Sequence, residues 1–263
     1  LEGLAAVVLA GGISSRFGSN KLLYRIDGET MLDRVWRVVA DTADNTYLSV
    51  RSAKQARLLT EICNVNPRSV IVDDRDLGCS GPVPGILSTA LKVKPKYLLT
   101  IPGDMPYIER RPLDHFIEII IEEGVGAGSI MVEWGVPAAL VQLHKTRWVL
   151  ERGWKISQIK IREVRASDLI RFAPSLVLVG AGLLTGNPLV FKNVNRPEDL
   201  KQAQQWEEMP KGVWRLGYGG RGWAGIELFH RSRYGPAAQV FFREGEYYHG
   251  RGVDLLAAHS YKD

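Results

Sequence analysis

The feature that most constrains this chain is an unbroken apolar run, residues 4–10, that ends directly in two adjacent glycines. A strand covered by helices on both faces has this pattern, because both alternating sets of its side chains are buried. Gly11 and Gly12 would then let backbone N–H groups approach a ligand closely. We therefore expect a parallel strand that ends in a binding loop at the carboxyl edge of a sheet.

Short apolar runs continue to alternate with helix-like segments along the first 200 residues. We expect strands at 47–50, 69–72, 97–101, 130–133, 138–143 and 190–194. We expect helices at 53–62, 84–91, 112–121, 145–151, 167–171 and 197–206, and a further helix capped by Thr30. This order predicts an α/β fold with a doubly wound, mostly parallel, Rossmann-like sheet.

The composition changes after residue 206, where glycine, arginine and aromatic residues dominate. We predict a main domain at 1–206 and a small C-terminal appendage at 207–263. Residues 240–242 and 247–248 flank Glu244 and Gly245, which suggests a hairpin. The appendage could pack on the sheet or form a homo-oligomer contact. Binding an acceptor substrate is the next possibility, and binding nucleic acid is the least expected.

The bulk composition narrows the class of protein. A chain of 263 residues, 45% of them hydrophobic, can bury its own core. Cys63 and Cys79 form no CxxC pair, so we expect neither a disulfide framework nor a zinc ribbon, and a cytoplasmic location. Glycine, proline and arginine interrupt the apolar stretch 169–191, so we expect no membrane helix. No basic segment precedes the first apolar run, so we expect no signal peptide.

Anionic ligands suit both the net charge of +5 and the loop after the first strand. This loop carries two cations, Arg16 and Lys21. A guanidinium forms forked bonds to phosphate, and an ammonium acts as a point charge. The loop is not a Walker A motif, because no Gly-Lys-Ser or Gly-Lys-Thr ends it. We expect it to hold a triphosphate.

Asp104 follows the expected strand at 97–101 and should lie at the same sheet edge as this loop. A carboxylate there could hold Mg²⁺ against the α-phosphate of the nucleotide. The alternative is a turn aspartate that accepts a hydrogen bond from its own backbone.

Several segments resemble the molybdenum cofactor guanylyltransferases, which are MobA-like nucleotidyltransferases. Residues 9–21 resemble the signature L-A-G-G-x-S-x-R-x-G-x-x-K, with Phe17 where Met is usual. Residues 103–106 are similar to a metal-binding C/G-D-M-P motif, and 81–86 to a G-P-L-x-G-I stretch. Residues 193–200 are similar to N-V/I-N-T-P-E-D-L, with Arg196 in place of Thr. The resemblance covers roughly residues 4–205.

The resemblance implies roles for individual residues. Arg16, Lys21 and Asp104 would be catalytic, and Asp104 and Asn195 would hold Mg²⁺. The nucleotide would contact Leu9, Ala10, Gly11, Gly12, Lys21, Arg51, Asp74 and Asp104. Asp74 would lie on the base and ribose side, unless it belongs only to a solvated acidic turn.

The implied reaction is attack by an acceptor phosphate on the α-phosphorus of a nucleoside triphosphate. The nucleophile is already an anion, so positioning and charge neutralisation would suffice. By resemblance the donor is GTP, the acceptor is molybdopterin held by residues 128–191, and molybdoenzymes or other cofactor-biosynthesis proteins are potential partners. The alternatives are a cytidylyltransferase that uses CTP, another small-phosphate nucleotidyltransferase, and a non-catalytic nucleotide-binding adaptor. Gly103, where guanylyltransferases commonly have Cys, leaves the base open, and Gly81-Pro82 favours guanine.

Overall fold

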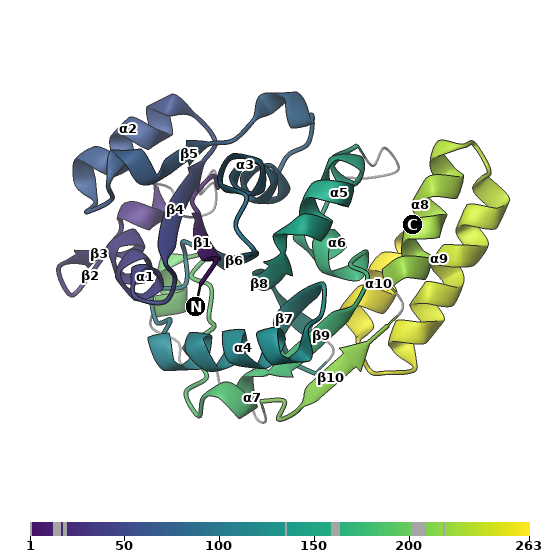
Figure 1. Cartoon of the computed structure of the whole chain (residues 1–263). Coiled ribbons are helices and arrows are strands. Elements are labelled where there is room, and N and C mark those ends of the chain that lie inside the picture. The colour runs from purple at the N-terminus through teal and green to yellow at the C-terminus, as the bar shows by residue number, and fades with distance from the viewer. Residues whose placement is uncertain are drawn as a thin grey trace.

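The computed structural model has one mixed eight-stranded sheet with helices on both faces (Figure 1), which confirms the predicted α/β fold. It describes residues 2–12, 17, 20–134, 136–158, 164–200, 209–217 and 219–263. The strand order is β10-β9-β7-β8-β6-β1-β4-β5. These strands are β1 Leu4–Leu9, β4 Asn45–Val50, β5 Val70–Val72, β6 Tyr97–Pro102, β7 Ala127–Glu133, β8 Val136–Lys145, β9 Leu176–Gly180 and β10 Val213–Leu216. A separate ribbon pairs β2 Arg25–Ile26 with β3 Glu29–Thr30.

The strands β6, β1, β4 and β5 run parallel to one another. Val8 of β1 lies opposite Leu48 of β4 and Ile101 of β6, so the three strands end at the same level. The strand β8 is antiparallel to β6 and β7, which makes the sheet mixed. The loops that follow β1, β4, β5 and β6 therefore meet at one edge of the sheet.

Two hydrophobic cores cover the two faces of the sheet, and β1 contributes to both. Leu4, Ala6 and Val8 belong to the first core, and Ala5 and Val7 to the second. This alternation explains why the whole run is apolar. The first core contains residues of α1 Met31–Ala40, α2 Ala53–Ile62, α4 Arg110–Glu123 and α7 Ala181–Leu184. The second contains residues of α3 Val83–Val93, α5 Thr146–Ser157 and α6 Ala166–Arg171.

The segment after residue 208 differs from the predicted hairpin. It contributes β10 to the sheet and then forms α8 Gly219–His230, α9 Tyr234–His249 and α10 Asp254–Lys262, which lie together on one side of the molecule (Figure 1). The hairpin was wrong because the buried positions of α9 follow a helical period: Ala237, Phe241, Glu244 and Tyr248. Gly245 is buried in this helix, and a Cβ there would lie 2.4 Å from a ring carbon of Tyr261.

The predicted strand at 190–194 is also wrong, because this segment is a loop. Both valines are buried without pairing as a strand: Val190 lies in the first core, and Val194 lies in a separate small cluster with Phe17 and Met31. The predicted helix at 197–206 begins as a 3-10 helix, η4 Pro197–Leu200, and its remainder lies outside the described residues. The other 3-10 helices in the described ranges are η1 Lys21–Leu23, η2 Pro67–Ser69 and η3 Arg75–Leu77. The division of the chain near residue 206 stays a prediction.

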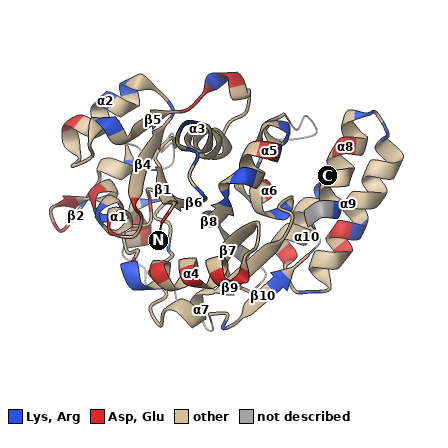
Figure 2. Ribbon diagram, viewed as in Figure 1, with Lys and Arg blue, Asp and Glu red and all other residues tan. Residues whose placement is uncertain are grey.

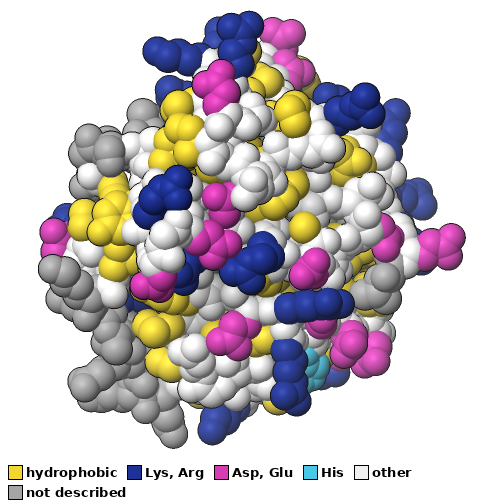
Figure 3. Space-filling model, turned by 90° about the vertical axis from the view of Figure 1, so that its left-hand side faces the viewer, with side chains coloured by type: hydrophobic (Ala, Val, Ile, Leu, Met, Phe, Trp, Pro, Cys, Tyr) yellow, Lys and Arg dark blue, Asp and Glu magenta, His cyan; other side chains and the backbone are white. Residues whose placement is uncertain are grey.

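Basic and acidic residues occur in all parts of the ribbon in Figure 2. On the face seen in Figure 3, basic and acidic side chains are interspersed. The described side chains on that face form no continuous basic patch of the kind that nucleic acids require. Within the described ranges, no helix has the length and apolarity needed to cross a bilayer. The apolar stretch 169–191 instead contains the end of α6, β9 and α7.

One cluster of charges is completely buried, and we call Arg171, Asp168, Glu244 and Asp263 the buried arginine cluster. The side chains of all four residues have 0% exposure. The Arg171 guanidinium forms an ion pair with Asp263 and lies 3.4 Å from Glu244 Oε2. It also lies 4.2 Å from the centre of the Phe172 ring. The cluster therefore joins α6 of the main sheet to α9 and to the end of α10.

The buried arginine cluster predicts a pH dependence of stability. Burial raises the pKa of Glu244 from 4.5 to about 7, although Arg171 opposes this shift. Between these pH values the folded state keeps a proton that the unfolded state has released. The free energy of unfolding should therefore fall as pH rises from 4.5 to about 7, by on the order of 3 kcal/mol. Urea unfolding across this range would measure it. Glu244→Gln should flatten the slope, and equal slopes in the two proteins would contradict the assignment.

Candidate functional site

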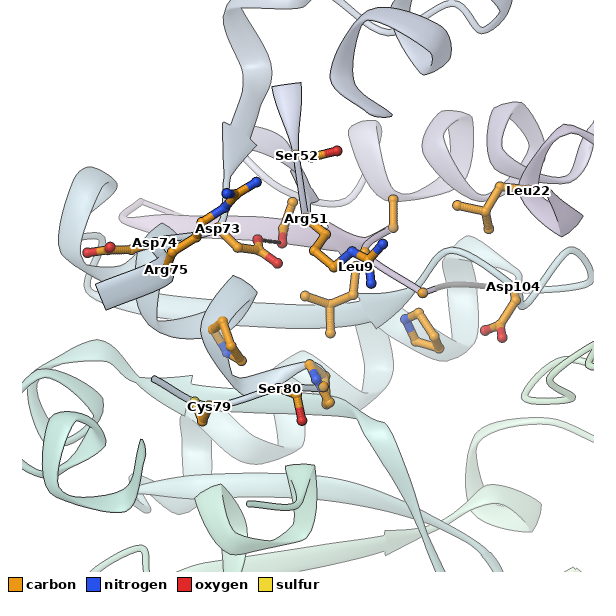
Figure 4. Close-up of a pocket in the computed structure, with 18 of the residues that line it drawn as sticks. Leu9, Leu22, Arg51, Ser52, Asp73, Asp74, Arg75, Cys79, Ser80 and Asp104 are labelled. Atoms are coloured by element: carbon orange, nitrogen blue, oxygen red, sulfur yellow. Dashed lines mark hydrogen bonds between the residues drawn. The ribbon is translucent and has the colours of Figure 1, made fainter. Parts of the chain in front are cut away.

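The loops at the carboxyl edge of β1, β4, β5 and β6 surround a cavity of about 870 Å³ (Figure 4). This volume suits a nucleotide-sized ligand. Every residue that the sequence analysis expected to contact the nucleotide lines it: Leu9, Ala10, Gly11, Gly12, Lys21, Arg51, Asp74 and Asp104. Arg16 lies outside the described residues, so its predicted role stays a prediction.

Backbone contacts hold the start of the glycine-rich loop against its neighbours. Ala10 N donates to Ser49 O at 2.8 Å, and Gln55 Nε2 donates to Ala10 O at 2.6 Å. A Cβ at Gly11 would lie 3.3 Å from Asp73 Oδ2 and 3.6 Å from the Arg51 backbone nitrogen. The loop therefore passes close to the ends of β4 and β5, and a side chain at Gly11 would crowd the Asp73 carboxylate.

One end of the cavity brings together three predicted residues from distant parts of the chain. Lys21 Nζ donates to Asp104 Oδ2 and, at 3.2 Å, to Asn195 Oδ1. The Lys21 and Asp104 side chains are 15% and 13% exposed. The three residues predicted from separate motifs thus meet at one point, where the ammonium of Lys21 lies between two side-chain oxygen atoms. We call Lys21, Asp104 and Asn195 the cation end of the cavity.

The side-chain oxygens of Asp104 and Asn195 are the kind of ligand that Mg²⁺ prefers. Asp104 Oδ1 is buried and has no hydrogen-bond partner among the described residues, so the carboxylate has an acceptor that they leave unused. Within the described ranges, no group of three or more His, Cys, Asp or Glu side chains could hold a metal ion. A magnesium ion held here would therefore take its other ligands from water and phosphate, as is common for Mg²⁺ at phosphate sites.

The loop that carries Asn195 is fixed by an aspartate from the same motif. Asp199 Oδ2 accepts hydrogen bonds from Asn195 N and Arg196 N, each at 2.8 Å. Val194 N donates to the backbone oxygen of Asp104 at 2.8 Å. These bonds hold the loop of Asn195 beside Asp104.

Toward the other end of the cavity, the structure distinguishes two adjacent aspartates. Asp73 Oδ1 accepts a hydrogen bond from Ser49 Oγ at 2.6 Å, and its carboxylate points into the cavity (Figure 4). Burial raises the pKa of Asp73, and the bond from Ser49 opposes this shift. Asp74 lines the cavity but points away from it in Figure 4, and its Oδ1 accepts from Asp76 N at 2.9 Å. Asp74 therefore caps η3, and Asp73 is the carboxylate available to a ligand.

Sequence reasoning missed Asp73 and Ser49 as site residues. The available signal was the position of Asp73, which is the first residue after β5. Ser49 precedes the last residue of β4, and a Cβ at Gly85 would lie 2.2 Å from its Oγ. The close approach of α3 to this hydroxyl could not be derived from local sequence.

Residues 79–82, which lead into α3, form another part of the wall. Burial raises the pKa of the Cys79 thiol, so it stays protonated and is a weak nucleophile at neutral pH. Val164 approaches the cavity from the second half of the chain. The cavity thus offers positioned charges, as the sequence analysis expected, and no covalent nucleophile is needed for a transfer between phosphates.

Comparisons with a protein-family model and with individual relatives point to the same family. Residues 6–208 match the model of the MobA-like NTP transferase domain, which ends before β10 and the three C-terminal helices. The molybdenum cofactor guanylyltransferase of Sinorhizobium fredii is 30% identical over 76% of this chain and 90% of its own length. A Pyrococcus horikoshii protein, named probable molybdenum cofactor guanylyltransferase, is 30% identical over 75% of this chain and 97% of its own length.

Solved structures show the same fold. The crystal structure of molybdopterin-guanine dinucleotide biosynthesis protein A from Archaeoglobus fulgidus aligns with a TM-score of 0.63. The alignment covers 76% of this chain and 97% of that chain, at 19% sequence identity. About three quarters of this chain thus share their fold with a known protein, and the remaining quarter lies outside that alignment.

Proposed function

Because this chain belongs to the MobA-like NTP transferase family and is a nucleotidyltransferase, we propose that it transfers GMP from GTP to the phosphate of molybdopterin. The products would be the guanine dinucleotide and pyrophosphate. Two relatives with this activity in their names are 30% identical to most of the chain. The observation that carries the proposal is the cavity with Lys21 and Asp104 at one end and Asp73 toward the other. Such a cavity can hold a triphosphate and a base together.

We assign the base-side role to Asp73 rather than to Asp74. Guanine presents two adjacent N–H donors, at N1 and N2, and one carboxylate can accept both. Each carboxylate accepts one hydrogen bond, but Asp73 points into the cavity, whereas Asp74 points away from it (Figure 4). Cytosine has an acceptor at N3, which a carboxylate would repel, so this geometry favours GTP over CTP.

The chemistry follows from charge placement at the cation end. Lys21 would neutralise the triphosphate and the charge that develops on departing pyrophosphate. Asp104 and Asn195 would hold Mg²⁺, which when bound supplies Lewis-acid stabilisation of the phosphate oxygens. Gly11 and Gly12 would bring backbone N–H groups to the nucleotide. The acceptor phosphate is itself the nucleophile, so the chain needs only to bind, orient and neutralise.

The proposal also covers the acceptor contacts, the partner proteins and the cellular location. Residues 128–191 would supply the acceptor contacts, because β8 lies next to β6 in the sheet and β7 lies next to β8. Molybdoenzymes or other cofactor-biosynthesis proteins would receive the product, and a homo-oligomer is compatible with the exposed aromatic residues of α9 and α10. The free cysteines Cys63 and Cys79 suit the cytoplasm.

Turnover measurements would test the proposed function. Pyrophosphate release would be followed with Mg²⁺ and either GTP or CTP, with and without molybdopterin. We expect release with GTP that depends on molybdopterin, and a rate with CTP at least about tenfold lower. Faster turnover with CTP would favour the cytidylyltransferase alternative. Nucleotide binding without release for any phosphate acceptor would favour the adaptor.

A pair of variants would test the base-side assignment. Asp73→Asn should lower the affinity for GTP by about tenfold to a hundredfold, because a carboxylate that accepts two hydrogen bonds is lost. Asp74→Asn is the matched control and should have a much smaller effect, because its carboxylate caps η3. Isothermal titration with GTP would measure both. A larger loss in Asp74→Asn would return the role to Asp74.

A further inference from the structure

The ammonium of Lys21 lies between the two side-chain oxygens that we assign to the magnesium ion. Nζ donates to Asp104 Oδ2 and to Asn195 Oδ1, the latter at 3.2 Å. Magnesium binds its oxygen ligands at about 2.0–2.1 Å. Lys21 in this position therefore fills the space that the ion would need, and two cations sharing the same oxygens would repel each other strongly.

From this geometry we infer that Lys21 is a removable counter-ion of the cation end, so that the free protein excludes divalent cations until a triphosphate draws Lys21 away. This inference rests on the proposed function, because it concerns the same metal and nucleotide. It goes beyond the static role of Lys21 as a phosphate ligand. It assigns the residue two successive partners, first Asp104 and then the triphosphate.

The exchange keeps every charge paired. In the free protein, Lys21 neutralises Asp104, whose side chain is only 13% exposed. A partly buried carboxylate without a cation is costly, so the ion pair keeps the empty site folded. When phosphates enter, Lys21 gains a new anion and releases Asp104 and Asn195. Lys21 is then paired with the triphosphate, and Asp104 is free to pair with a magnesium ion. The nucleotide and the magnesium ion should therefore each bind weakly without the other.

The positions of backbone and side chain suit this movement. Asn20 Oδ1 accepts from Leu22 N at 3.2 Å and holds the backbone around Lys21 at the start of η1. The lysine side chain is a flexible four-carbon stem that ends in a compact charge, so it can change partners while its Cα stays fixed. Asp199 holds the Asn195 backbone by hydrogen bonds that do not involve Lys21. The loop that carries Asn195 should therefore stay in place when Lys21 changes partner.

The inference predicts that Lys21→Met binds a divalent cation more tightly than the unchanged protein when no nucleotide is present. Mn²⁺ would replace Mg²⁺, and the electron paramagnetic resonance signal of the free ion would measure binding. We expect affinity to rise by about tenfold, within the usual range for coupled sites. Lys92→Met removes the same charge from an exposed position on α3 and should bind Mn²⁺ like the unchanged protein.

Equal or weaker Mn²⁺ binding by Lys21→Met would overturn the inference. Lys21→Gln gives a second version of the test, with a side chain that stays polar, and circular dichroism would verify that each variant is folded. The titration contains no nucleotide, so its result is independent of the choice between GTP and CTP. If the protein did not transfer GMP, the Mn²⁺ titration could still support the inference on Lys21. If Lys21→Met did not bind Mn²⁺ more tightly, the transferase proposal would still stand.

Discussion

Asp104→Ala is expected to lower the rate of nucleotidyl transfer by about a thousandfold at saturating GTP and Mg²⁺. Asp104 is the only carboxylate at the cation end as described, and Asn195 contributes just a neutral amide oxygen. Without Asp104, that amide would be the remaining protein ligand at the cation end, and the other ligands of a magnesium ion would be water and phosphate. The substitution should act mainly on kcat, because the metal stabilises charge that develops during transfer.

The fold should survive this change. Asp104→Ala removes the ion pair with Lys21, but Lys21 Nζ still donates to Asn195 Oδ1, and the backbone oxygen of residue 104 still accepts from Val194 N. Asp114→Ala removes a carboxylate from an exposed ion pair with Arg110 on α4 and serves as the matched control. Pyrophosphate release and thermal unfolding would be measured for both variants. Full activity of Asp104→Ala with Mg²⁺ present would refute the metal assignment.

The sequence predicted the cation end because each residue there follows a strand or belongs to a short motif. Lys21 and Asp104 follow strands that are neighbours in a parallel sheet, so their meeting follows from the order of elements. Asn195 was found from its motif alone, since the expected strand before it is a loop. The position of that loop depends on the bond between Val194 N and Asp104 O, which no local pattern encodes.

The proposed base side was less predictable, because the adjacent carboxylates of Asp73 and Asp74 point in different directions. Asp73 and Asp74 have the same chemistry, and only the cap of η3 decides which carboxylate turns outward. The hairpin predicted at residues 240–248 was wrong because the prediction relied on local strand preference. Aromatic and β-branched residues favour strands locally, yet the buried set of α9 forms one helical stripe that packs in the second core.

Arg171→Met is expected to lower the free energy of unfolding by about 3–5 kcal/mol at pH 8. Methionine can fill much of the same space but leaves Glu244, Asp168 and Asp263 without the cation they share. The loss should shrink as pH falls toward 5. The raised pKa of Glu244 allows this residue to bind a proton there, which removes one buried charge. Urea unfolding at pH 5 and pH 8 would measure both effects.

Arg215→Met is the matched control, because Arg215 forms a two-bond ion pair with Glu123 at a position where the arginine is 66% exposed. An exposed pair contributes less than about 1 kcal/mol, so this variant should unfold almost like the unchanged protein. If Arg171→Met were equally mild at pH 8, the buried arginine cluster would not hold α8–α10 to the sheet. Arg171 does not line the nucleotide cavity, so kcat per folded molecule should stay unchanged. A fall in that kcat would instead show that the buried arginine cluster affects the site; α6 and α10 both contact β8, the strand that pairs with β6.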